Sequence, residues 1–239
     1  MSVGAQEIAE LLASHGATRS APLLDDEAQY VDACLTLDRE RVEALLRTHP
    51  GYRTSPRAMF EAARRDRPDA LALLLDLGVP IEVQDPTGKR ALHEAAISNA
   101  LRAARFLIER GAEIDPREST YGGAPIGWAA HADHSEMIDL LSGRSRNIWV
   151  LCFRGYVDRV REILSENASL ARELDREGCT PLWWLPDDER KAMAIVELLL
   201  AAGADAAHRN RHGNTAASWA RRRGMTEVAG RLDEAAPAS

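Results

Sequence analysis

One short motif recurs along this chain of 239 residues, and it constrains the fold more than any other feature. Each copy begins with a glycine and places a leucine, isoleucine or alanine four positions later; the copies start at Gly88, Gly122, Gly178 and Gly213. The apolar positions of the first two copies, Leu92 and Ile126, lie 34 positions apart, and those of the last two, Leu182 and Ala217, lie 35 apart. Self-similarity at such a period is typical of a solenoid, in which each unit packs only on its neighbours.

A second pattern follows the first within the same period. Residues 70–78, 104–112 and 195–204 each carry apolar side chains at i, i+3 and i+4, and each contains a glycine at or near its end. This spacing predicts an amphipathic helix, and the glycine supplies the left-handed residue that commonly ends one. Each period therefore contains a turn motif and at least one helix.

Together the two patterns resemble the ankyrin repeat, whose signature G-x-T-P-L-H-x-A-A is followed by I-V-x-L-L-L-x-x-G-A. The resemblance implies an all-α solenoid of stacked helix-turn-helix units with short β-hairpin finger loops. We predict about six units over residues 21–239, including a C-terminal capping helix at 226–236. Residues 1–20 are predicted to form an N-terminal half-repeat, an outer helix with no inner helix before it.

Two irregularities interrupt the repeat. Ile126 and Ile148 occupy equivalent positions but lie only 22 apart, so the loop between their units lacks most of its finger. Leu185-Pro186 replaces the expected Ala-Ala pair. Because proline lacks the N–H that a helix interior needs, Pro186 should end or kink that inner helix early.

Charge and cysteine content narrow the function. The formal net charge is −7, whereas a general nucleic-acid binder needs a surplus of Lys and Arg. Cys34, Cys152 and Cys179 form no C-x-x-C pair, so neither a disulfide framework nor a zinc site is indicated. No apolar run approaches the length of a membrane span. We expect a soluble cytoplasmic protein that binds neither nucleic acid nor membranes.

The sequence assembles no active site, and we expect no enzyme activity, cofactor or metal. His93 occupies the histidine position of the turn motif, where the resemblance implies a hydrogen bond to local backbone. His131 and His134 are three positions apart and could share a helix face, but no further ligand is placed near them. A metal-dependent enzyme using these two histidines stays as the lesser alternative.

The five tryptophans allow two interpretations. Trp128, Trp184 and Trp219 come two positions after the apolar position of their units, and Trp149 and Trp183 come one after it. The resemblance sends these positions into the packing between inner helices, so we expect core residues. The alternative is a partly exposed aromatic ladder that anchors a partner.

The resemblance implies that a partner protein binds to the finger loops and to the exposed, concave side of the inner helices. Transferred position by position, the predicted binding residues are Arg64, Arg65, Lys89, Ile97, Tyr121, His131, Phe153, Arg154, Arg176, Arg211, Arg222 and Arg223. We expect an acidic protein segment, with Tyr121 and Phe153 as anchors and the arginines as charge partners.

A structural alternative rests on the unpaired helix at residues 8–12. The chain would then be the C-terminal part, or a subunit, of a larger ankyrin assembly that packs through its N-terminal face. The sequence thus leaves open whether the chain acts as a monomer.

Overall fold

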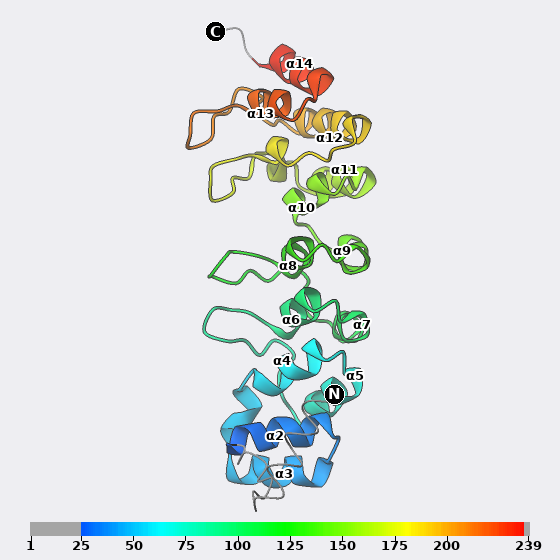
Figure 1. The fold of residues 1–239 in the computed structure, drawn as a ribbon, viewed down its shortest axis with the longest axis vertical. Coiled ribbons are helices and arrows are strands. Elements are labelled where there is room, and N and C mark those ends of the chain that lie inside the picture. Colours follow the sequence, from blue (N-terminus) through cyan, green and yellow to red (C-terminus); the bar gives the residue numbers. More distant parts are fainter. Residues whose placement is uncertain (1–24, 237–239) are drawn as a thin grey trace, which may run out of the picture.

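The computed structural model describes residues 25–236 as an elongated stack of helix pairs (Figure 1). The predicted half-repeat at residues 1–20 lies outside the described residues. The inner helices are α2 (Asp26–Leu35), α4 (Arg57–Arg64), α6 (Ala91–Ile97), α8 (Pro125–His131), α10 (Ile148–Phe153), the 3-10 helix η3 (Pro181–Trp183) and α13 (Ala216–Arg222). The outer helices are α3 (Arg39–Thr48), α5 (Pro68–Asp76), α7 (Leu101–Glu109), α9 (Ser135–Ser142), α11 (Val157–Glu166), α12 (Glu189–Ala201) and α14 (Thr226–Ala235).

These elements make seven pairs within residues 25–236, one more than the repeat count predicts. Two short 3-10 helices, η1 (Pro50–Thr54) and η2 (Ala168–Arg172), link consecutive pairs. The predicted all-α solenoid is confirmed. Over the same residues the finger loops contain only isolated bridges, Gln84 to Arg90 and Arg209 to Thr215, rather than strands.

Two turns recur in unit after unit, one after the outer helix and one between the inner and the outer helix. Gly111 and Gly203 end outer helices with φ of 87°, a left-handed conformation that a Cβ disfavours. The turn from inner to outer helix also needs a positive φ, and non-glycine residues adopt it at Leu37 and Asp66 (φ 61° and 53°). Single residues that adopt a positive φ therefore determine where the helices end.

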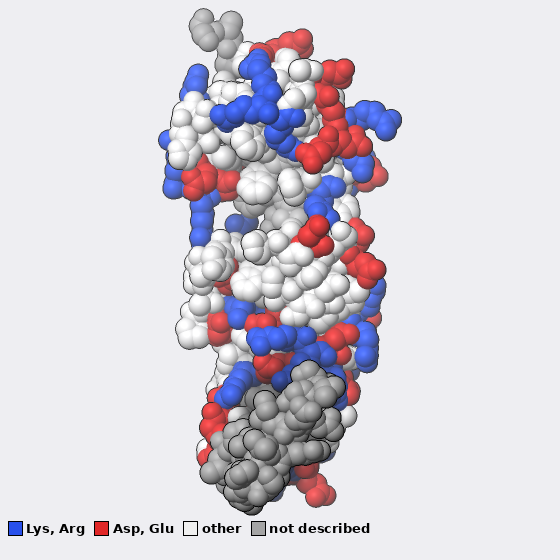
Figure 2. Space-filling model, in the orientation of Figure 1, with Lys and Arg blue, Asp and Glu red and all other residues white. Residues whose placement is uncertain are grey.

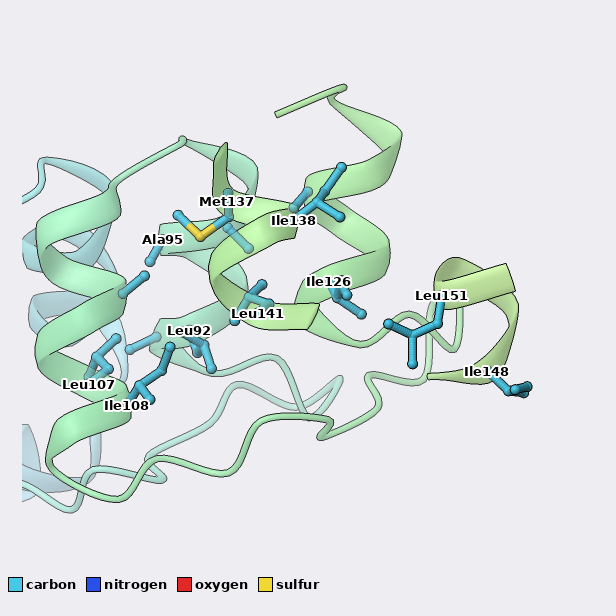
Figure 3. Packing of buried hydrophobic residues seen from close by; sticks show 14 of the residues in the cluster. Leu92, Ala95, Leu107, Ile108, Ile126, Met137, Ile138, Leu141, Ile148 and Leu151 are labelled. Carbon is cyan, nitrogen blue, oxygen red and sulfur yellow. The ribbon is translucent and has the colours of Figure 1, made fainter. Parts of the chain in front are cut away.

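The core is a continuous column of small and branched apolar side chains along the stack. Figure 3 shows its middle, where Leu92 of α6 and Ile126 of α8 lie among residues of the outer helices such as Leu107 and Leu141. All four of these side chains are at most 2% exposed. Alanines on the inner helices, such as Ala95 and Ala129, are fully buried and allow neighbouring units to approach closely.

Polar contacts fix the register between neighbouring units. The Asp66 carboxylate accepts a hydrogen bond from the backbone N–H of Ala103 in the next outer helix, at 2.7 Å. The ring of His134 bonds the carbonyl oxygen of Ile97 one unit earlier, at 3.0 Å. These bonds join residues 37 positions apart and so act between units.

The two predicted irregularities are both present. Between α9 and α10 the chain crosses in residues 143–147 and forms no finger, which leaves a gap in the row of fingers in Figure 1. Before Pro186 the inner element is reduced to the three residues of η3. Of the helices described, none is long and apolar enough to cross a membrane.

Candidate functional site

A row of aromatic side chains lies exposed on the side of the stack formed by inner helices and fingers. Tyr121 is 73% exposed, Phe153 45%, and Trp184 and Trp219 39% each. The expectation that the tryptophans belong to the core is confirmed for Trp183, which is 8% exposed, and is wrong for Trp184 and Trp219. We call Tyr121, Phe153, Trp184 and Trp219 the aromatic ladder.

Edge and tilted ring contacts order these side chains. Phe153 meets Trp184 edge-on with ring centroids 6.2 Å apart, and Trp219 lies 6.3 Å from the buried Trp183. Tyr121 meets the half-buried Trp128 edge-on at 6.5 Å. Aromatic pairs favour such geometries, so the exposed rings are held in place before any partner arrives.

Trp184 points outward and is held there by a residue of the finger before η3. It follows η3 directly, and its Nε1 donates to the Asp175 carboxylate of the preceding finger at 3.0 Å. The ring therefore lies across the finger base instead of between inner helices. Trp219 holds the equivalent position in the complete helix α13 and is equally exposed, and both rings line the same hollow, so the core expectation failed because this position faces the groove.

Tyr121 is positioned by a buried carboxylate. Glu118 is 1% exposed and accepts hydrogen bonds from the backbone N–H groups of Thr120 (2.7 Å), Tyr121 (3.0 Å) and Gly123 (3.0 Å). Burial alone would raise the pKa of Glu118, but these hydrogen bonds outweigh it and hold the pKa below its usual value. The backbone of the finger tip that carries Tyr121 is therefore held by hydrogen bonds to the negatively charged Glu118 carboxylate.

The ladder lines a groove made of three adjoining hollows of about 490, 520 and 570 Å³. Tyr121, Gly127 and His131 are shared by the first two hollows, and Phe153 and Trp184 by the second and third. The face seen in Figure 2 is largely uncharged across the middle of the array, with charged side chains gathered above and below. The groove itself combines both kinds of side chain, since Arg117, Asp175 and Arg176 line its middle hollow beside the aromatic rings.

Five of the predicted cationic binding residues are already neutralised within the protein. Arg64 and Lys89 both pair with the buried carboxylate of Glu94, at 3.1 and 2.7 Å. Arg65 pairs with Glu61, Arg154 with Asp133, and Arg223 with Asp187. Each of these pairs must be broken or shared before its cation can bind an acidic partner.

The remaining predicted arginines have no carboxylate partner within residues 25–236. Arg222 stacks over the Trp219 ring with its guanidinium carbon 5.2 Å from the centroid, Arg176 donates to backbone carbonyls only, and Arg211 is exposed. Sequence reasoning missed Arg117, whose guanidinium lies 5.0 Å from the centre of the Trp149 ring. No repeat signature marks its position, so only the fold could reveal it.

The histidines have structural roles where they are buried. His93 is fully buried, its Nδ1 accepts from the Arg90 N–H at 3.1 Å, and its ring lies 3.3 Å from the Gly123 carbonyl oxygen. Burial lowers the pKa of His93, which favours the neutral ring. His131 is exposed at the end of α8 while His134 bonds backbone, and no group of three metal-ligating side chains occurs in the part of the chain described. Cys34, Cys152 and Cys179 are free and buried.

Stacked helix pairs, finger loops and a groove on the inner side define a helical-repeat protein of the solenoid class. A sequence profile for "Ankyrin repeats (3 copies)" matches residues 31–118 and 59–150, which together span half of the chain. The chain belongs to the ankyrin repeat family.

Similar proteins agree with this assignment. The chain is 27% identical over 181 residues to the putative ankyrin repeat protein YahD of Escherichia coli, covering 70% of this chain and 90% of that protein. It is also 27% identical over 175 residues to the B-cell lymphoma 3 protein homolog of the mouse, covering 72% of this chain and 34% of that protein.

Among solved structures, an ankyrin repeat domain from Acinetobacter baumannii matches with a TM-score of 0.54 and 25% identity, over 74% of this chain and 96% of that one. Ankyrin repeats are generally protein–protein interaction modules, and the fold is generally non-catalytic. The chain is therefore a member of a family whose usual role is to bind other proteins.

Proposed function

We propose that this protein is a non-catalytic adaptor that binds a partner protein in the groove lined by the aromatic ladder. The observation that carries the proposal is the exposure of four large aromatic side chains on the same side of four consecutive units. Aromatic residues are enriched at interaction hot spots because they bury a large area with few rotatable bonds. Exposing them without a partner leaves that area in water.

Charge refines the kind of partner. Of the predicted cationic binding residues, three have no carboxylate partner among the described residues and lie along the finger side and the C-terminal end of the groove: Arg176, Arg211 and Arg222. Aromatic residues and arginine are both enriched at protein interfaces. The partner segment should therefore carry apolar and acidic residues close together.

Free buried cysteines fit a protein that works in a reducing compartment, which supports a cytoplasmic location.

Affinity capture from the cells that produce the protein tests the proposal. Wild type is compared with a Tyr121→Ala/Phe153→Ala double variant, and with an Arg105→Ala/Glu162→Ala control altered only on the outer helices α7 and α11. Circular dichroism first verifies that each variant folds. The ladder variant should lose the partner, with an affinity loss of roughly 30- to 1000-fold for about 2–4 kcal/mol, while the control retains it.

Equal recovery with the ladder variant would place the interface elsewhere. Recovery lost only with the control variant would move it to the outer helices.

A further inference from the structure

We infer that the opening left by the missing finger is a pocket for one aromatic side chain of the partner, next to an acidic residue. The inference deepens the proposed function and rests on it. It concerns the 520 Å³ hollow, which we call the gap pocket.

The gap pocket lies where a finger would otherwise run. Its floor is α10, through Trp149, Val150 and Phe153, and its sides are the finger before α8 and the finger before η3. With no finger entering between them, the surface is hollowed at this level on the finger side (Figure 2). A loop of normal length before α10 would fill this space.

A cross-link between the flanking fingers holds the opening in shape. The Arg176 guanidinium donates to the carbonyl oxygens of Ser119 (3.3 Å) and Thr120 (3.1 Å), more than fifty positions earlier in the chain. The side chain therefore spans the place of the absent finger and fixes the two walls relative to each other. A preformed pocket lowers the entropy that a ligand must overcome on binding.

The lining favours an aromatic guest. Tyr121, Trp149, Phe153 and Trp184 come from three parts of the chain, the finger before α8, the helix α10 and the residue after η3, and all border the pocket. Rings in this arrangement offer both edges and faces, which suit an added ring in edge-to-face or offset contact. The volume lies within the range of roughly 300–1,000 Å³ found for small-ligand sites, enough for one large side chain and part of the chain that carries it.

The rim favours a carboxylate beside that ring. Arg117 stacks on Trp149, and the carboxylate nearest to it, that of Glu173, is 3.9 Å away at the limit of an ion pair. Asp175 is the acidic lining residue, and its oxygens already accept from the Trp184 Nε1 and from the N–H groups of Glu177 and Cys179. The rim thus carries two guanidinium groups, Arg117 and Arg176, beside two carboxylates, of which Asp175 is occupied by its hydrogen bonds and Glu173 lies at the limit of an ion pair with Arg117.

The guest belongs to an extended chain because the pocket is one hollow in a row. It shares Gly127 and His131 with the hollow between α6 and α8, and Phe153 and Trp184 with the hollow beside α13. Packed helices are about 8–10 Å apart, which corresponds to about three residues of extended chain at roughly 3.3 Å each. Because alternate side chains of an extended chain point to opposite sides, anchor side chains two or four positions apart face the groove together and can reach successive hollows.

Gly127 allows the pocket to be filled without disturbing the fold. It lies in α8 and lines the pocket, and a Cβ added there would meet no atom within 4 Å. Gly127→Met places an unbranched side chain in the cavity while removing a helix-destabilising glycine. Gly230→Met in the C-terminal outer helix α14 is the matched control, since its added Cβ also meets nothing within 4 Å.

The test selects peptides from a random twelve-residue library displayed on phage, using the full-length wild-type protein as bait. Synthetic copies of the recovered peptides are then titrated against wild type and each variant by fluorescence anisotropy. We expect the peptides to share an aromatic residue next to Asp or Glu. Gly127→Met, Arg117→Ala and replacement of the peptide's aromatic residue by alanine should each weaken binding at least tenfold, whereas Gly230→Met should leave it unchanged.

The other outcomes separate the inference from the proposed function. Peptides that lose affinity with Phe153→Ala/Trp219→Ala but not with Gly127→Met would overturn the gap pocket and leave the groove. Peptides whose affinity is unchanged by Phe153→Ala/Trp219→Ala and by Gly127→Met would overturn both the gap pocket and the proposed groove. A concentration-dependent dimer in analytical ultracentrifugation, abolished by Gly127→Met, would assign the pocket to a second copy of this chain and overturn the partner peptide.

Discussion

The carboxylate of Glu118 should stabilise the finger that presents Tyr121, and its removal can be measured. Glu118→Ala leaves three backbone N–H groups without their acceptor, those of Thr120, Tyr121 and Gly123. Hydrogen bonds to a charged group contribute about 1.5–3 kcal/mol each when intact. Thr120 and Tyr121 are exposed and regain water, so we expect the free energy of unfolding to fall by about 2–4 kcal/mol in total.

Glu118→Gln provides the matched comparison. The amide keeps the shape and one acceptor oxygen, which can still serve Tyr121 and Gly123, but it loses the charge and the acceptor for Thr120. We expect about half of the alanine effect, or about 1–2 kcal/mol. Urea unfolding at pH 7, followed by circular dichroism, gives both values.

The pH dependence follows from the lowered pKa of Glu118. A carboxyl group whose pKa is lower in the folded state stabilises the protein fully above its unfolded pKa, here taken as the ordinary value of 4.5. That stabilisation is lost as the pH falls through the folded pKa. The stability difference between wild type and Glu118→Gln should therefore be constant from pH 7 to about pH 5 and shrink toward pH 3.

Two results would contradict these predictions. One is a free energy of unfolding for Glu118→Ala that lies within about 0.5 kcal/mol of the wild-type value at pH 7. The other is a stability difference between wild type and Glu118→Gln that grows as the pH falls.

Two further changes test other parts of the scaffold. Glu94→Gln should lower the free energy of unfolding by about 1–2 kcal/mol at pH 7, because Lys89 and Arg64 lose a charged acceptor that holds α4 against α6; urea titration gives the value, and an unchanged midpoint would contradict it. Leu37→Asn should raise the thermal midpoint, with a gain of about 1 kcal/mol, because asparagine tolerates the left-handed φ of 61° better than leucine does; calorimetry would show no gain if the turn is unstrained.

The scaffold was predictable because single residues and short periods determine it. The helix-ending glycines Gly111 and Gly203, the proline after η3 and the 22-residue spacing before Ile148 all act locally. Each could be read along the chain without knowledge of what packs where. This is why the unit order and the missing finger were both predicted.

The state of the charged side chains was not predictable in the same way. Arg64 and Arg65 occupy exposed positions at the C-terminal end of the inner helix α4, yet both are engaged by acidic residues, one of which lies on the next unit. Such a pairing depends on the geometry between units, which no repeat pattern encodes. Trp184 was misplaced for a related reason, since its outward direction follows from a finger residue, Asp175, that captures its indole.

The short crossing at residues 143–147 also bears on how such a protein can change its partners. Because each unit of the stack packs only on its neighbours, a deletion confined to a loop leaves the helices and their contacts in place. A single deletion of this kind alters the shape of the proposed binding surface by the width of a loop, without replacing any core residue. Conversely, grafting the 205–215 loop into this crossing should close the surface again, so in the proposed groove a change of loop length would alter partner selectivity more than a single side-chain substitution would.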